Sequence, residues 1–203
     1  MLRRWRNDSP RHANADAALR MIEGDEVRLV GLIAAGESSA FEQLYRAYHP
    51  RLTRFLERVM RRRGLMEEVL NDTLLVVWHC AGSYDRTSKV STWIFAIAYR
   101  KALKALQRLD EPLADDQVVE RVDLGPGPEQ QLSGWQLHVA LVRALDDLSP
   151  EHRAVVDLTY FHGIGYREIA EIVDCPVDTV KTRMFHARRR LKRLLGGKLA
   201  DWL

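Results

Sequence analysis

Apolar residues recur at spacings of three and four along residues 25–108, which is the period of amphipathic helices. Two stripes, interrupted at Gly36–Ser39, are formed by Val27, Val30, Ile33, Ala34, Phe41, Leu44, Tyr45 and Tyr48. The pattern resumes after Pro50 and closes at Arg61–Gly64, where cations and a glycine are typical of a helix C-terminus. Two more helices are predicted at about 67–81 and 91–108, separated by a polar loop. Strand patterns are nearly absent, so this half is predicted to be an all-α bundle of about four helices.

Two segments lack this period. Residues 1–24 carry no stripe of large apolar residues, and we expect a disordered or weakly helical tail. Residues 110–129 contain seven acidic residues and only one arginine, and the Gly-Pro-Gly-Pro sequence at 125–128 cannot continue a helix. We therefore predict a flexible acidic linker over residues 109–131. Its acidity either keeps it solvated or lets it follow a basic channel, and both interpretations remain open.

A second helical domain is predicted over residues 132–203. It opens with a leucine stripe formed by Leu137, Leu141, Leu145 and Leu148. Ser149 is a candidate N-cap with Pro150 at the first helical position, and Gly163 is expected to end that helix. A short helix at about 167–173, a break at Asp174–Pro176 and a longer helix from Pro176 then have the lengths of a helix-turn-helix.

The longer helix has one apolar and one basic face. The predicted inward stripe consists of Val180, Met184, Ala187, Leu191 and Leu194. The first turns of such a helix meet base edges. There a lysine can donate to guanine, a threonine can contact either base of a pair, and a phenylalanine can contact the thymine methyl group. Arginines later in the helix are better placed to contact phosphates. The predicted DNA-contacting residues are Thr179, Lys181, Thr182, Arg183, Phe185, His186, Arg188 and Arg189. Alternatively, this could be a basic helix that is simply exposed to solvent. The lengths of the preceding helix and turn, which fit a helix-turn-helix, disfavour that interpretation.

Composition narrows the classes of function. The 203 residues are 46% hydrophobic with a formal net charge of +3, which suits one large or two small domains. Cys80 and Cys175 are far apart in the sequence, and neither lies near a pair of histidines. We therefore predict no disulfide, no metal site and no cofactor. No nucleophile with a base or pair of carboxylates is evident, which argues against an enzyme such as a recombinase or nuclease. Without a secretory signal or a membrane-length apolar run, we expect a cytoplasmic protein that does not insert into membranes.

Three blocks of this sequence resemble the sigma-70 family, in particular its extracytoplasmic-function (ECF) group. The run "LSPEHRAVVDLTYFHGIGYREIAEIVDCPVDTVKTRMFHARRRLKRLL" at 148–195 resembles region 4 of that group. "VSTWIFAIAYRKALKAL" at 90–106 resembles regions 2.3 and 2.4, and "EEVLNDTLLVVW" at 67–78 resembles region 2.2. The resemblance implies a sigma factor with region 2 at 25–108 and region 4 at 132–203. Its partners would be core RNA polymerase (β′ clamp helices and β flap), promoter DNA and an anti-sigma factor.

The resemblance also implies roles for residues of the first domain. The region 2.2 helix would bind the β′ clamp helices through the face opposite Leu70, Leu74 and Val77, and that face carries Glu68, Asn71, Asp72 and Leu75. The loop 83–91 and the following helix would open the −10 element by capturing unstacked bases. The matching residues are Ser83, Lys89, Ser91, Arg100, Lys101 and Lys104. Trp93, Phe95 and Ile97 are expected to be core residues rather than stacking platforms.

Departures from the family pattern affect promoter preference. Arg100 and Lys104 stand where the family often has asparagine and aspartate, and His186 stands where arginine is frequent. The −10 and −35 sequences therefore cannot be copied from relatives. An alternative function is a stand-alone helix-turn-helix repressor or activator whose first domain senses a ligand.

Overall fold

A computed structural model of the chain describes residues 24–110, 144–145 and 147–195. A helix over residues 24–34 comes first. It is followed by α2 (Ser38–Met60), α3 (Arg63–Cys80), the short 3₁₀ helix η1 (Ala81–Ser83), α4 (Val90–Asp110), α6 (Pro150–Tyr160), α7 (Tyr166–Ile172) and α8 (Val177–Leu195). No strand occurs among the described residues, which confirms the all-α class. The predicted tail up to residue 23, most of the linker and the start of the leucine stripe lie outside the described residues.

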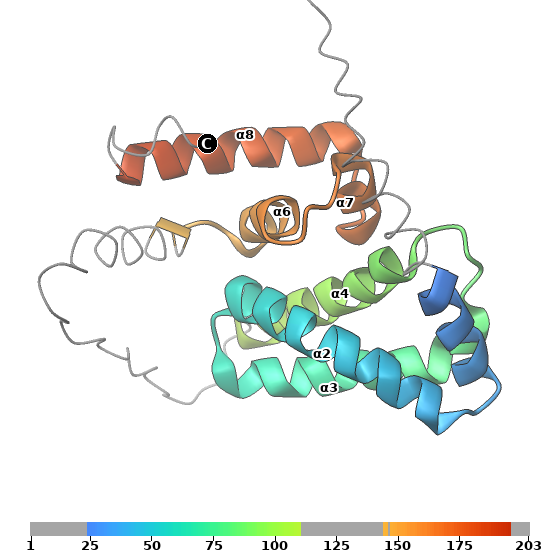
Figure 1. The fold of residues 1–203 in the computed structure, drawn as a ribbon. Helices are drawn as coiled ribbons and strands as arrows, with labels where there is room; N and C mark the ends of the chain where they lie inside the picture. The colour runs from blue at the N-terminus through green and yellow to red at the C-terminus, as the bar shows by residue number, and fades with distance from the viewer. Residues whose placement is uncertain (1–23, 111–143, 146, 196–203) are drawn as a thin grey trace, which may run out of the picture.

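The N-terminal helices pack α2, α3 and α4 against one another, with the helix 24–34 at one end (Figure 1). Their core contains the fully buried side chains of Tyr48, Phe55 and Phe95, and the two phenylalanine rings meet edge to face at 5.2 Å. Phe95 and Ile97 are buried and Trp93 is half-buried against Tyr84, as expected for core residues. Pro50 lies inside α2, which continues through it as one helix.

The end of α2 differs from the sequence prediction. The helix stops at Met60, and Arg61 takes the left-handed conformation, with φ of 60°, that closes it. Gly64, predicted to mark the stop, lies in the first turn of α3. The reversal is therefore made by a non-glycine residue, whose N–H donates to the Glu57 carbonyl at 3.1 Å.

The C-terminal helices are placed as predicted, with shifted ends. Ser149 caps α6, accepting from the His152 N–H, and Pro150 is its first residue. That helix ends at Tyr160, because the chain turns through Phe161–Gly163, where Gly163 has a positive φ of 64°. The turn between α7 and α8 contains Asp174 in the left-handed conformation. The inward stripe is confirmed for Val180, Met184, Ala187 and Leu191, all buried.

The two halves pack directly against each other. α6 lies on α2 and α7 lies on α4, whereas α8 packs on α6 and α7 (Figure 1). The helix-turn-helix is therefore a layered unit with α8 on the outside. This arrangement decides which candidate surfaces are open and which are covered.

Candidate nucleic-acid and protein interfaces

The outer face of α8 presents the predicted DNA-contacting side chains. Lys181, Thr182, Phe185, His186 and Arg189 are exposed, and Phe185 retains 60% of its accessible surface. Its ring contacts that of His186, with 5.5 Å between the centroids, and an apolar group this exposed can also contact a partner. Thr179 is half-buried. The face thus combines an apolar ring with Lys181 in the N-terminal half of the helix, where a recognition helix approaches bases, and with Arg189 further along.

Neighbouring side chains contact two of these cations. Lys181 Nζ lies 2.9 Å from Asp178 Oδ1, and the hydrogen bond from Lys181 lowers the pKa of Asp178. Arg188 donates to the Tyr160 hydroxyl at 3.0 and 2.7 Å. The Thr182 hydroxyl donates to the Asp178 carbonyl at 2.9 Å. Arg188 is thereby oriented, and Lys181 has a carboxylate partner that DNA would have to displace or share.

Arg183 differs from the other candidates because it faces the N-terminal half. Its side chain is half-buried and interacts with the Tyr99 hydroxyl of α4. Burial raises the pKa of Tyr99 to about 12, although Arg183 acts in the opposite direction. In this arrangement Arg183 bridges the two halves rather than joining the exposed face of α8.

The loop before α4 holds the first group of predicted −10 residues. Its shape is set by two local contacts: Tyr84 donates to the Ser88 carbonyl at 2.6 Å, and Asp85 accepts from Thr87. Ser83 donates to the Cys80 carbonyl, and Ser91 is half-buried. Lys89 is exposed, and its Nζ lies 2.8 Å from Glu168 of α7.

The remaining predicted −10 residues form a basic rim along α4. Arg100, Lys101 and Lys104 surround an open cavity of about 240 Å³ whose floor is Val76 and Ile97. Lys101 Nζ lies 2.9 Å from Asp72 Oδ2 of α3. The structure therefore brings two predicted surfaces together, since Asp72 belongs to the proposed polymerase face and Lys101 to the proposed DNA face.

The outer face of α3 has the predicted composition. Glu68, Asn71, Asp72 and Leu75 are all exposed, and Leu75 retains 53% of its accessible surface. Leu70, Leu74 and Val77 on the opposite face are buried. An exposed leucine flanked by carboxylates and an amide could pack on a partner helix while the carboxylates pair with its cations.

Sequence reasoning missed the residues that join the halves. Arg58 Nη1 of α2 lies 2.6 Å from Asp157 Oδ1 of α6, and Asp157 is 2% exposed. His162 also approaches Asp157, at 3.1 Å, and its ring meets Phe95 at 4.7 Å. A polar residue in the apolar stripe of α6 was the only available signal, and it did not indicate a partner 99 residues away.

Within the part of the chain that the structure describes, no helix is long and apolar enough to cross a membrane. The same residues hold no group of three or more metal-ligating side chains. What the fold and its exposed faces define is a helical protein with a C-terminal helix-turn-helix and an N-terminal bundle that has a second basic surface.

Two family models match this chain. "Sigma-70 region 2" matches residues 44–111, and "Sigma-70, region 4" matches residues 138–191. The chain therefore belongs to the sigma-70 family, and both of its domains occur in the expected order. The alternative of a stand-alone regulator is not favoured, because the N-terminal half matches a sigma-70 domain and not a separate sensing domain.

Curated relatives and solved structures agree with this assignment. The chain is 27% identical over 173 residues to the ECF RNA polymerase sigma-E factor of Escherichia coli K12, covering 80% of this chain and 90% of the relative. It is 26% identical over 176 residues to that of Haemophilus influenzae, covering 81% and 92%. The fold resembles CnrH in complex with the cytosolic domain of CnrY, with a TM-score of 0.63 and 24% identity over 84% of this chain and 97% of that one. It also resembles RpoE of Bartonella quintana in complex with the anti-sigma factor NepR, with a TM-score of 0.59 and 23% identity over 78% and 98%. The chain is thus a sigma factor of the ECF group, which directs RNA polymerase to promoters.

Proposed function

We propose that the C-terminal domain, residues 132–203, recognises the −35 element through the exposed face of α8. The observation that carries this proposal is the coincidence of Lys181, Phe185 and Arg189 on one open face of the second helix of a helix-turn-helix. Lysine and phenylalanine near the N-terminus of the helix suit base edges, and the later arginines suit phosphates. His186 adds a donor or acceptor that departs from the family pattern, so it is a candidate specificity residue.

The first domain, residues 25–108, would bind core polymerase and open the −10 element. Glu68, Asn71, Asp72 and Leu75 would meet the β′ clamp helices, and the C-terminal domain would meet the β flap. The loop containing Ser83, Lys89 and Ser91 would capture unstacked bases, while the basic rim of α4 would follow the backbone. Cations at Arg100 and Lys104 shift the balance toward phosphates.

The chain itself would be a non-catalytic initiation factor in the cytoplasm, acting in a stress or extracytoplasmic response. Residues 109–131 would act as a linker and residues 1–24 as a tail. An anti-sigma factor is a further proposed partner, because the similar RpoE structure is a complex with one. Two small domains joined by a linker leave several surfaces that an inhibitor could occupy.

Run-off transcription with purified core polymerase on a library of DNA fragments tests this function. We expect specific transcripts that depend on the chain and begin downstream of a shared pair of elements. The absence of specific transcripts, together with the absence of binding to core polymerase, would overturn the proposal. A variant with Phe185→Ala and Arg189→Ala should lose transcripts while retaining core binding, which separates promoter recognition from docking.

A further inference from the structure

One acidic residue lies among the basic side chains of α8. Asp178 is the second residue of this helix, and the remaining charged residues of the helix are all basic. α8 is the outermost helix of the C-terminal half (Figure 1), and the Asp178 side chain retains 90% of its accessible surface. A carboxylate on a DNA-binding helix repels phosphates and so lowers non-specific affinity. Its presence at this place therefore requires an explanation other than phosphate binding.

The helical period places Asp178 on the proposed DNA face. Asp178, Thr182, Phe185 and Arg189 follow one another at intervals of four, three and four residues, which is the spacing of a single helix face. All four side chains are exposed, whereas Val180 on the inward stripe is buried. The N-terminal residues of a recognition helix are the ones that contact base edges. The first residue on the proposed DNA face is therefore a carboxylate.

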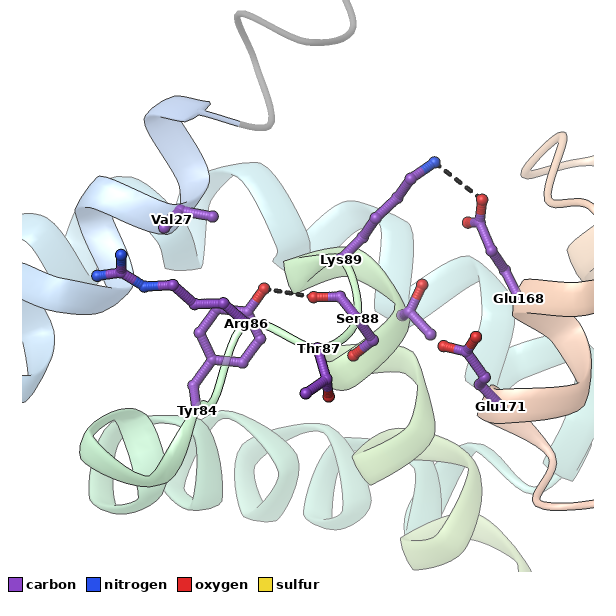
Figure 2. Close-up of a pocket in the computed structure, with 9 residues that line it drawn as sticks. Val27, Tyr84, Arg86, Thr87, Ser88, Lys89, Glu168 and Glu171 are labelled. Atoms are coloured by element: carbon purple, nitrogen blue, oxygen red, sulfur yellow. Dashed lines mark hydrogen bonds and ion pairs between the residues drawn. The ribbon is translucent and has the colours of Figure 1, made fainter.

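Asp178 and Lys181 form a pair of opposite charges at this end of the helix. Lys181 Nζ lies 2.9 Å from Asp178 Oδ1, and its hydrogen bond lowers the pKa of Asp178. The carboxylate is therefore ionised at neutral pH and only accepts hydrogen bonds. The Lys89–Glu168 pair, in contrast, joins the loop before α4 to α7 at an open cavity (Figure 2). Because Asp178 and Lys181 belong to one helix, they stay side by side whatever packs against α8.

These two charges match the major-groove edge of a G·C pair. Lysine donates to guanine O6 and N7, and aspartate accepts from the cytosine N4 amino group. Guanine O6 and cytosine N4 are neighbours, because they are hydrogen-bonded to each other within the pair. An ammonium beside a carboxylate presents a donor next to an acceptor in the matching order. In an A·T pair the amino donor lies between two acceptors, so the ammonium reaches only one of them.

We propose that Asp178 is a specificity-determining residue that reads one G·C pair of the promoter duplex together with Lys181. Asp178 accepts from the cytosine amino group, and Lys181 donates to the guanine of the same pair. Where DNA offers no such amino group, the carboxylate repels it, and this repulsion adds to specificity. The inference rests on the proposed function, since it takes α8 to be the helix that reads the −35 element. It goes further by assigning a base pair to an acidic residue outside the predicted set of DNA contacts.

Selection from a library of duplexes with a randomised −35 element, by the full chain bound to core polymerase, identifies the base pair. We expect the wild type to enrich a G·C pair at one position. Asp178→Ala should lower the preference for G·C over A·T at that position about fivefold to tenfold. Glu57→Ala is the matched control, because it removes the same charge at an exposed position of α2 and should keep the wild-type preference.

The affinity for duplexes that lack this pair separates the proposal from a role in helix stability. Asp178→Ala should bind them more tightly than the wild type. The slope of log affinity against log salt should also steepen by roughly 0.9, because Lys181 is then free to bind one phosphate. A carboxylate in the first turn that only stabilises the helix through its dipole would instead weaken binding to every duplex when it is removed. That outcome would overturn the proposal.

A duplex with N4-methylcytosine in the selected pair tests the contact itself. The methyl group replaces the amino hydrogen that faces the major groove and leaves the pairing hydrogen in place. We expect the wild type to lose affinity about fivefold, and Asp178→Ala to bind the methylated and unmethylated duplexes alike. Because the Asp178 side chain is 90% exposed, the variant should fold, and circular dichroism checks its helical content.

Equal sensitivity of the two proteins to the methyl group, or an unchanged base preference in Asp178→Ala, would overturn the proposal. So would a wild-type chain that enriches specific duplexes without a G·C pair that depends on Lys181. Failure of the proposed function would be seen separately, as absent run-off transcripts with no duplex enriched by the wild type.

Discussion

The Tyr160 hydroxyl accepts two hydrogen bonds from the Arg188 guanidinium, at 3.0 Å from Nε and 2.7 Å from Nη2. Tyr160 is the last residue of α6 and Arg188 lies on α8, so the contact fixes the direction of an arginine on the proposed DNA face. Planar guanidinium groups lose less freedom on binding when they are already oriented. The pair therefore links the scaffold of the helix-turn-helix to a proposed phosphate contact.

Arg188→Ala should weaken binding to all duplex sequences alike and reduce the slope of log affinity against log salt by about 1. Tyr160→Phe is the matched control, because it removes the orienting oxygen but leaves the charge. We expect a smaller loss of affinity with the same salt slope. Fluorescence anisotropy over a series of salt concentrations measures both. A sequence-dependent loss for Arg188→Ala would make this residue a base contact.

Lys181→Ala should cost about 1–3 kcal/mol at one base pair of the −35 element and relax specificity there. The reason is its place in the first turns of α8, where a lysine reaches guanine acceptors. Binding to a panel of duplexes with single base changes measures the effect. Asp178→Asn serves as a companion variant, since it removes the carboxylate that holds Lys181 Nζ at 2.9 Å. If Lys181→Ala weakened every duplex equally, Lys181 would be a phosphate contact instead.

Asp72→Arg should weaken binding to core polymerase, because it reverses charge on the exposed face of α3 and releases Lys101 from its 2.9 Å ion pair. Binding of the same chain to a −35 duplex should stay at the wild-type level. Glu57→Arg, at an exposed position of α2, makes the same charge change away from this face. Surface plasmon resonance with immobilised core compares the three proteins. Equal affinity of Asp72→Arg and wild type would remove Asp72 from the docking surface.

Stability should fall on acidification in part through His152. Burial lowers the pKa of this side chain, whose Nδ1 lies 2.7 Å from Ser149 Oγ, although Glu151 acts in the opposite direction. A histidine with a lowered pKa in the folded state contributes stability above its unfolded pKa of about 6.5 and loses it as pH falls through the folded value. His152→Gln should therefore lose less stability than the wild type between about pH 7.5 and about pH 5.5. Urea unfolding at both pH values measures this, and equal losses in the two proteins would contradict it.

Local pattern was sufficient to predict the helix-turn-helix. Its caps, turn and inward stripe all depend on residues within a few positions of one another, as Ser149, Pro150 and Val180 illustrate. The two faces of α3 followed from period alone for the same reason. The end of α2 was less accurately predicted, because Arg61 adopts the left-handed backbone conformation that is more common for glycine and was therefore expected at Gly64.

The packing of one half on the other could not be predicted. Arg58 and Asp157 are 99 residues apart, and although Asp157 interrupts the apolar stripe of α6, nothing near it in the sequence indicates Arg58 as its partner. His162 likewise sits in a turn whose sequence says nothing about Phe55 or Phe95. Long-range pairing depends on the shapes of two finished domains, which a one-dimensional pattern does not contain. For that reason the sequence predicts the −10 loop without indicating that α7 lies against it.

The distance along the chain between Arg58 and Asp157 also sets an order of events during synthesis. At translation rates of about 5–20 residues per second, the 99 residues between them take roughly 5–20 s to appear. Once Asp110 has been added, the N-terminal helices are complete, while α7, which lies against their proposed strand-binding loop, is still to be made. Each newly made molecule is therefore expected to begin in an open form. Polymerase already present beside the ribosome would therefore meet the N-terminal half before α6 and α7 have packed on it.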